Sequence, residues 1–158
     1  MWIDDKIKRI GDKIESLKAD NKKVISSSSF QSHSIPLLHL ISLVDNSIPI
    51  YFLNTGFHFA ETIAFKNEVS ELLDLNTINL NSATEKLFQK DTHGRFFYTS
   101  ETSYCCYINK ILPMEEALKT NDIWIAGVRK DQTKTRSSFN EIEDGPHGTK
   151  RFHPILDW

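Results

Sequence analysis

Residues 24–44 read VISSSSFQSHSIPLLHLISLV, and this stretch decides the fold. Its first two residues are typical of a short buried strand, which the serine run 26–29 ends. Residues 34–44 are apolar nearly all round, which indicates a buried helix, and Pro36 suits its first turn. His39 on this helix is expected in the core with its hydrogen bonds satisfied. The stretch therefore predicts a strand, a serine-rich turn and a helix.

The same alternation of strands and helices continues along the chain. A continuous apolar run predicts a strand over residues 48–53, and further strands are expected over residues 75–80 and 122–126. Helical spacing of apolar residues predicts helices over residues 3–17, 59–73 and 114–119, whereas 81–104 is expected to be irregular or partly helical. This order is typical of an α/β fold with a parallel sheet and helices on both faces. We expect an amphipathic helix in residues 1–20 and one domain over residues 21–158.

Polar segments follow three of the expected strands. They are residues 27–34, 54–56 and 127–136. Ligands of parallel α/β sheets bind beyond the carboxyl ends of the strands, so these segments are expected to share one edge. The serine-rich turn also offers backbone N–H groups and the positive end of a helix, which favour a phosphate or sulfate. Capping of the helix by Ser32 or Ser34 is the alternative, and both interpretations stay open at this point.

Composition narrows the function classes. The 158 residues carry 19 Lys and Arg against 21 Asp and Glu, a formal net charge of −2, which argues against a broad nucleic-acid surface. No apolar run approaches the roughly 18 residues of a membrane-spanning helix. The only two cysteines, Cys105 and Cys106, are adjacent, so a disulfide framework is excluded. With no visible secretory signal, we expect a cytoplasmic protein without nucleic-acid or membrane partners.

Five segments resemble, in order, the motifs of the phosphoadenosine phosphosulfate / adenosine phosphosulfate reductase family of the PP-loop superfamily. They are residues 29–40 (SFQSHSIPLLHL), 53–62 (LNTGFHFAET), 105–110 (CCYINK), 124–136 (WIAGVRKDQTKTR) and 153–158 (HPILDW). The likeness covers roughly residues 22–158. Five motifs in one order make the resemblance specific, and it implies the PP-loop fold of adenine nucleotide alpha hydrolase-like proteins.

The resemblance implies a reaction of sulfate assimilation and cysteine biosynthesis. Members of the family reduce adenylyl sulfate, or 3′-phosphoadenylyl sulfate, to sulfite and AMP (or its 3′-phosphate). A C-terminal cysteine attacks the sulfur, and thioredoxin or a similar reductant resolves the resulting thiosulfonate. The sequence does not indicate which sulfonucleotide is preferred, or the oligomeric state.

The serine turn and the family motifs together predict the substrate site. Lys110 matches a family lysine near the substrate sulfate, Gly127 is expected to let the base approach closely, and Arg136 is expected to supply a cation. The complete expected set is Ser28, Ser29, Phe30, Gln31, Ser32, His33, Ser34, Asn54, Thr55, Gly56, Lys110, Gly127, Arg129 and Arg136.

The cysteine pair allows two interpretations. Adjacent thiols suit a soft metal or an iron–sulfur cluster, but on their own they are also compatible with two half-buried unreactive thiols. In the family branch with two adjacent cysteines, this pair and a later CxxC hold a 4Fe–4S cluster. The resemblance thus implies that Cys105 and Cys106 are two of four cluster ligands, with low occupancy expected in this chain.

The chain also departs from the family pattern. It has no second CxxC and no further cysteine, so we expect it to be incomplete at its C-terminus, a fragment or a shortened relative, and inactive as a reductase by itself. A non-catalytic nucleotide-binding remnant is one alternative. A PP-loop nucleotidyl enzyme is another, disfavoured because Phe30, Gln31 and His33 stand where such enzymes carry two glycines and an aspartate.

Overall fold

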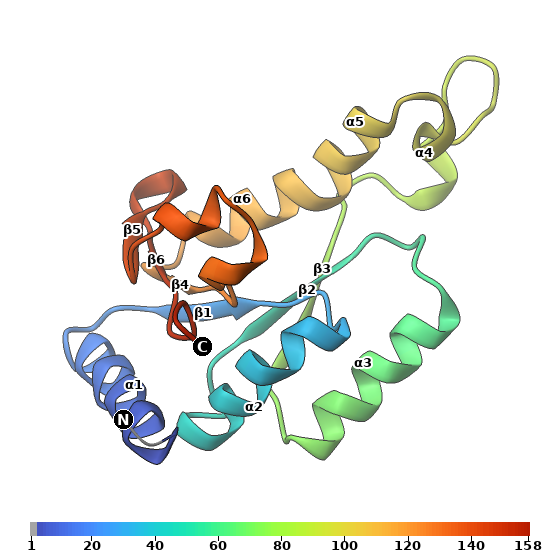
Figure 1. The fold of residues 1–158 in the computed structure, drawn as a ribbon. Helices are drawn as coiled ribbons and strands as arrows, with labels where there is room; N and C mark the ends of the chain where they lie inside the picture. Colours follow the sequence, from blue (N-terminus) through green and yellow to red (C-terminus); the bar gives the residue numbers. More distant parts are fainter. Residues whose placement is uncertain (1–2) are drawn as a thin grey trace.

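The computed structural model describes residues 3–158, built around a six-stranded sheet in the order β3-β2-β1-β4-β6-β5 (Figure 1). Neighbouring strands run parallel, except that β5 is antiparallel to β6. The strands are β1 (Val24–Ser27), β2 (Ile50–Asn54), β3 (Thr77–Asn81), β4 (Ile123–Ile125), β5 (Ile142–Asp144) and β6 (Lys150–Phe152).

Helices cover both faces of the sheet. In Figure 1, α1, α2 and α3 lie on one face, and α5 and α6 lie on the other. The helices are α1 (Ile3–Ala19), α2 (Ile35–Val44), α3 (Ala60–Leu72), α4 (Phe97–Ser100), α5 (Thr102–Cys106) and α6 (Leu112–Leu118), with a π-helical segment at Tyr107–Ile111. None of the helices in residues 3–158 has the length and apolar character to cross a bilayer.

The larger core lies between the sheet and helices α1 and α2. Ile10 and Ile14 of α1 are buried there because the apolar stripe of this helix repeats every three to four residues. Leu38 of α2 and Ile50 of β2 are fully buried in the same cluster. A smaller cluster around Met114 and Leu118 of α6 covers the opposite face. Helix α1 is therefore part of the same packed body as the sheet.

The strand order fixes where a ligand site can form. Strand β1 is paired with β2 on one side and with β4 on the other, both parallel, so the chain reverses its winding direction between β1 and β4. At such a switch point the loops after neighbouring strands separate and leave a crevice. The segments after β1, β2 and β4 all begin at this edge, as the sequence predicts.

The parallel sheet and the helices on both faces are confirmed, with three differences. Strands β5 and β6 were not predicted, and β5 adds an antiparallel edge. Helix α2 is buried on one side only: Leu43 is 57% exposed, because that side of the helix faces solvent. The expectation of a core position for His39 is wrong for the same reason, since its side chain is exposed.

Candidate functional site

A cavity of about 550 Å³ lies at the carboxyl ends of β1, β2 and β4. It gathers residues from the three loops that follow these strands and from the π-helical segment. Of the predicted residues, it is lined by Ser28, Ser29, Gln31, His33, Ser34, Lys110, Gly127 and Arg136. Five predicted residues, Phe30, Ser32, Asn54, Gly56 and Arg129, do not line any cavity described for residues 3–158, and Thr55 lines a neighbouring one.

The serine turn is organised by its own side chains. Ser28 Oγ accepts a hydrogen bond from the Phe30 N–H at 3.0 Å, and the hydroxyl oxygens of Ser29 and Ser34 are 3.4 Å apart. No side chain in residues 3–158 caps the helical turn 32–34 or helix α2, so the capping interpretation is not supported. The N–H groups of Ser32 and His33 also find no acceptor in the described chain. The turn thus keeps donors available for an anion.

Phe30 supports the serine turn from the side of the hydrophobic core. Its backbone has φ +55°, a region that favours glycine, and its side chain is buried against Phe52 with edge-to-face rings 5.9 Å apart. This backbone conformation costs about 1 kcal/mol in a residue with a side chain, and burial of the ring offsets it. Phe30 therefore fixes the backbone of the turn, and its buried side chain does not line the cavity.

The loop after β2 contributes different residues from those predicted. Thr55 Oγ1 accepts a hydrogen bond from the Phe57 N–H at 3.2 Å, and Gly56 turns the chain with φ +77°. This turn places Phe57 and His58 in the cavity lining in place of Asn54 and Gly56. The imidazole Nε2 of His58 lies 2.9 Å from the carbonyl oxygen of Leu53, which fixes the ring. Their position in the same family-like segment was the only available signal for these residues.

The loop after β4 brings one glycine and one cation to the cavity. A Cβ added at Gly127 would lie 3.2 Å from Leu37 Cδ2, so this glycine has a packing role against α2 whatever binds above it. The Arg136 guanidinium donates to Gln132 Oε1, and both residues line the cavity. Arg129 points elsewhere, because its Nε pairs with Asp131 Oδ1 at 3.1 Å.

A second cavity, of about 230 Å³, adjoins the first. Cys105 and Cys106 line it, and Phe57 and Lys110 line both cavities. The Cys105 side chain is partly buried and that of Cys106 is exposed. Lys110 thus lies between the cysteine pair and the serine turn.

A buried amide pair holds the cysteine-bearing helix. Gln89 Nε2 donates to Asn109 Oδ1 at 3.0 Å, and Asn109 Nδ2 donates to Gln89 Oε1 at 2.6 Å. Both side chains are 1% exposed. Asn109 Nδ2 also lies 3.0 Å from the carbonyl oxygen and 3.5 Å from Sγ of Cys105. The pair therefore ties the segment before α4 to the first cysteine.

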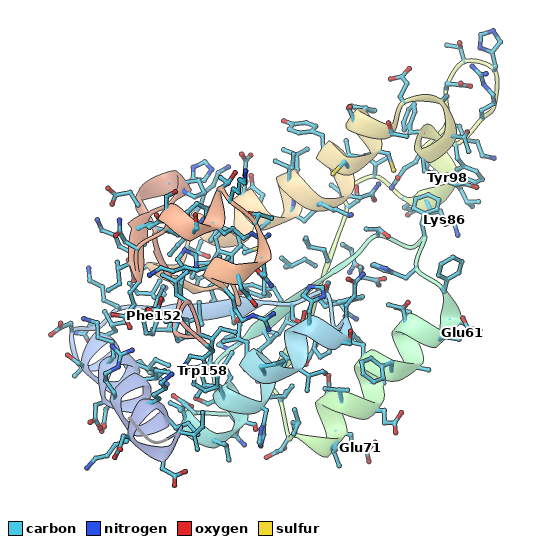
Figure 2. The ribbon with its side chains drawn as sticks, viewed as in Figure 1. Glu61, Glu71, Lys86, Tyr98, Phe152 and Trp158 are labelled. Atoms are coloured by element: carbon cyan, nitrogen blue, oxygen red, sulfur yellow. The ribbon has the colours of Figure 1, made fainter. Side chains whose placement is uncertain are left out.

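Aromatic rings and a loop ordered by Asp91 complete the arm of the molecule, residues 84–111. Lys86 and Tyr98, both labelled in Figure 2, contact the Phe57 ring, at 4.9 and 5.0 Å from its centroid. Further out, the backbone N–H of Arg95 lowers the pKa of Asp91 to about 2, aided by the His93 N–H and the Arg95 side chain. Asp91 thereby closes the loop between residues 90 and 96.

Cys105 and Cys106 can be compared with the ligand set that a 4Fe–4S cluster needs. Such a cluster takes four protein ligands, usually thiolates. Residues 3–158 contain no group of three or more His, Cys, Asp or Glu side chains placed to hold a metal ion. The two thiols fit half of the ligand set, beside a cavity with an adjacent cation, and the other half is not provided by the described residues.

The sequence matches one protein family over most of its length. The profile of the phosphoadenosine phosphosulfate reductase domain matches residues 23–158. The adenosine 5′-phosphosulfate reductase of Chelativorans sp. (strain BNC1) is 33% identical over 141 residues, and that of Bacillus velezensis is 34% identical over 138 residues. These alignments cover 88% and 86% of this chain but only 56% and 59% of the relatives. The chain thus spans less than two thirds of the length of these relatives.

Solved structures agree on the fold. The phosphoadenylyl-sulfate reductase of Candida auris, crystallised as a phosphate complex, has a TM-score of 0.72 at 18% identity, covering 86% of this chain and 66% of that chain. The FMN adenylyltransferase of Candida glabrata, in complex with FMN and an ATP analogue, has a TM-score of 0.54 at 14% identity, covering 87% and 45%. Both likenesses concern the fold alone. With a family profile matched from residue 23 to residue 158, this chain belongs to the phosphoadenosine phosphosulfate reductase domain family.

Proposed function

We propose that this chain carries the nucleotide-binding part of an enzyme that reduces adenylyl sulfate, or 3′-phosphoadenylyl sulfate, to sulfite. The observation that carries the proposal is one cavity lined together by the serine turn, Lys110 and Arg136. We assign the reductase domain to residues 21–158 and the reaction to the cytoplasm, where thioredoxin-type reductants and reduced cysteines occur.

The cavity has suitable partners for each part of a sulfonucleotide. Its anionic phosphosulfate requires hydrogen-bond donors and positive charge, which the serine turn and the two cations offer. Its planar base requires an apolar wall, and Leu37, Phe52 and Val128 line the same cavity. Among the predicted ligands outside the lining, Ser32 contributes through its backbone N–H, whereas we assign no direct contact to Arg129.

The cysteine pair completes the proposal on the other side of Lys110. Cys105 and Cys106 would provide two thiolate ligands of a 4Fe–4S cluster, and the remaining two are not among the cysteines of this chain. A cluster bound there supplies redox and electrostatic chemistry next to the substrate. The role of this chain is to hold those two ligands and to place Lys110 between them and the sulfo group.

The reduction itself requires a nucleophile. A cysteine thiolate attacks the sulfur, the bond from sulfur to the phosphate oxygen breaks, and AMP leaves with that oxygen. A second thiol, from thioredoxin or a similar donor, then attacks the cysteine sulfur, releases sulfite and forms a disulfide. We assign Cys105 and Cys106 to ligation and not to attack. Alone, this chain is therefore proposed to bind the sulfonucleotide without releasing sulfite.

Calorimetric titration of the purified chain with adenylyl sulfate, 3′-phosphoadenylyl sulfate and ATP tests the binding step. We expect either sulfonucleotide to bind more tightly than ATP. Arg136→Ala should weaken sulfonucleotide binding by about 10- to 100-fold, because it removes a charged hydrogen bond. Arg129→Ala is the matched control, since Arg129 pairs with Asp131 outside the cavity, and it should change affinity less than about twofold. Equal losses from both variants, or tighter ATP binding, would contradict the proposal.

Anaerobic sulfite assay with reduced thioredoxin tests the chemical step. We expect no turnover above the protein-free control. Multiple turnovers that disappear in Cys105→Ser or Cys106→Ser would show that one of these thiols is the nucleophile. Binding without turnover, even in the presence of a separately supplied cysteine-bearing C-terminal segment of a relative, would favour a nucleotide-binding module over a reductase part.

A further inference from the structure

Trp124 does not line the proposed substrate cavity, but it forms a hydrogen bond with a residue that does. Its indole Nε1–H donates to Ser27 Oγ at 2.9 Å. Ser27 is the last residue of β1 and lines the cavity beside the serine turn. Neither residue is in the set of ligand residues that the sequence predicts, although Ser27 begins the predicted polar segment 27–34. The contact joins two strands, β1 and β4, at the switch point where the cavity opens.

The indole is held in one orientation from both sides. The Arg151 guanidinium lies over the Trp124 ring at 4.7 Å from its centroid, and the two residues are register partners on β6 and β4. On its other flank, Trp124 packs against the cluster formed by Ile25, Met114 and Leu118. Packed on these neighbours, the ring keeps its N–H directed at Ser27.

The hydrogen-bonding capacities of the two side chains decide what Ser27 can do next. An indole N–H can only donate, so Ser27 Oγ must act as the acceptor in this contact. A serine hydroxyl retains one hydrogen to donate, and none of the hydrogen bonds found within residues 3–158 uses it. Because Ser27 lines the cavity, that hydrogen is available to a ligand there.

We propose that Trp124 is a positioning residue that orients the Ser27 hydroxyl to donate a hydrogen bond to an anionic oxygen of the bound sulfonucleotide. This inference rests on the proposed function, because it names a further contact in the same cavity. The proposal adds Ser27 to the ligand-binding side chains. Because Trp124 of β4 donates to the Ser27 hydroxyl oxygen, it leaves the hydroxyl hydrogen to be donated to the ligand. Arg151 supports the arrangement by stacking on the indole.

The preceding serine provides a matched control. Ser26 also makes a side-chain hydrogen bond across the sheet, but its Oγ donates to the carbonyl oxygen of Ile125 at 2.9 Å and its side chain is fully buried. Successive residues of a strand point to opposite faces, so Ser26 is turned away from the cavity that Ser27 lines. Loss of the Ser26 hydroxyl should reduce stability without changing ligand affinity.

The first test concerns the contact itself and requires no ligand. The indole N–H resonance of Trp124 can be assigned by its disappearance in Trp124→Phe, a variant that keeps an aromatic ring for packing. Ser27→Ala should move this resonance upfield, because it removes the acceptor, whereas Ser27→Thr should leave it close to its original position. A Trp124 indole resonance that does not move in Ser27→Ala would overturn the inference.

The second test is a double-mutant cycle on affinity for adenylyl sulfate. Ser27→Ala should weaken binding by about 10- to 100-fold, since it removes a hydrogen bond to a charged group, and Ser27→Thr should restore most of it. Trp124→Phe should weaken binding by less, about 3- to 10-fold, because Ser27 remains but is no longer oriented. In the Ser27→Ala background, Trp124→Phe should have no additional effect, whereas Ser26→Ala should leave affinity unchanged in either background.

The outcomes separate this inference from the proposed function. Independent, multiplying effects of Ser27→Ala and Trp124→Phe would show that the tryptophan acts only on the fold, which overturns the inference and leaves sulfonucleotide binding intact. Unchanged affinity in Ser27→Ala has the same consequence. A wild-type chain that binds no sulfonucleotide would instead overturn the proposed function, and with it the ligand contact assigned to Ser27.

Discussion

The two walls of the cavity are built in different ways. The serine turn stands on the main core: Phe30 and Leu37 beneath it are buried together with helix α2 and strand β2. The opposite wall is carried by an arm, residues 84–111, on which Leu87 and Phe88 are 70% and 72% exposed. Figure 1 shows α4 and α5 extending away from the sheet. One wall is therefore fixed by global folding, and the other by a few local contacts.

This difference matters for how each wall contributes to binding. Donors aimed at an anion are effective when they need no rearrangement on binding, and a core-mounted turn provides that. The arm instead relies on the Gln89–Asn109 amide pair and on the rings around Phe57. Segments with few buried apolar contacts open locally at lower free energy than the whole domain. We therefore expect the arm, residues 84–111, which carries the cysteine pair, to unfold locally without unfolding of the serine turn.

The largest expected effect on stability comes from removing the buried side chain beneath the serine turn. Phe30→Ala should lower the free energy of unfolding by about 3–5 kcal/mol, because a fully buried ring is replaced by a cavity. Urea unfolding followed by tryptophan fluorescence measures it. Phe88→Ala, on the exposed arm, is the control and should stay within about 0.5 kcal/mol of the original protein. Similar decreases in the free energy of unfolding in both variants would contradict the view that the serine turn is supported by the core and the arm is not.

Gly127→Val should also destabilise the core-mounted wall, by about 1–3 kcal/mol. A Cβ at this position would lie 3.2 Å from Leu37 Cδ2, so a valine overpacks the contact with α2. Thermal unfolding of Gly127→Val with and without Leu37→Ala measures the coupling. The double variant should be less destabilised than the sum of the single ones, because the smaller side chain at 37 makes room. If the stability losses of the two single variants simply add in the double variant, contact with Leu37 is not the reason why position 127 needs a glycine.

The sequence predicts the central strands of the sheet much better than the strands at its edge. Strands β2 and β4 are continuous apolar runs because both faces are covered, and that signal is visible in one sequence. Strands β5 and β6 each have three residues, mostly polar, and so lack any periodic pattern. Their pairing at the sheet edge follows from tertiary contacts alone.

The same division applies to the site. The serine turn, Lys110 and Arg136 were found from a strand-end argument and family motifs, since both concern contiguous residues. The amide pair joins side chains 20 positions apart and leaves no local pattern, so it was not predicted. Arg129 was expected in the site because it lies in a motif, but its partner Asp131 draws it away.

Breaking the amide pair should open the arm without unfolding the domain. Gln89→Leu leaves the buried Asn109 amide with fewer partners, which costs about 1–3 kcal/mol locally. Hydrogen exchange followed by mass spectrometry should show faster exchange over residues 84–111 and unchanged exchange in β1 and α2. Ser103→Ala, on the exposed surface of α5, is the control. Faster exchange spread evenly over the whole chain would indicate that the arm is not an independent unit.

The smallest effect concerns acid and the outer loop of the arm. Hydrogen bonds from the Arg95 N–H and its neighbours lower the pKa of Asp91 to about 2, below its ordinary value of 3.8. A carboxyl with a lowered pKa in the folded state stabilises it fully above pH 3.8, and this contribution is lost as the pH falls toward 2. Proteolysis by pepsin between pH 4 and pH 2 should therefore accelerate at residues 90–96 as the pH falls, beyond the change in pepsin activity on an unstructured peptide of the same sequence. In Asp91→Asn, which lacks the titrating group, cleavage in this loop should be fast already at pH 4 and should follow the peptide at every pH. A pH dependence retained in Asp91→Asn would place the acid-sensitive group elsewhere in the arm.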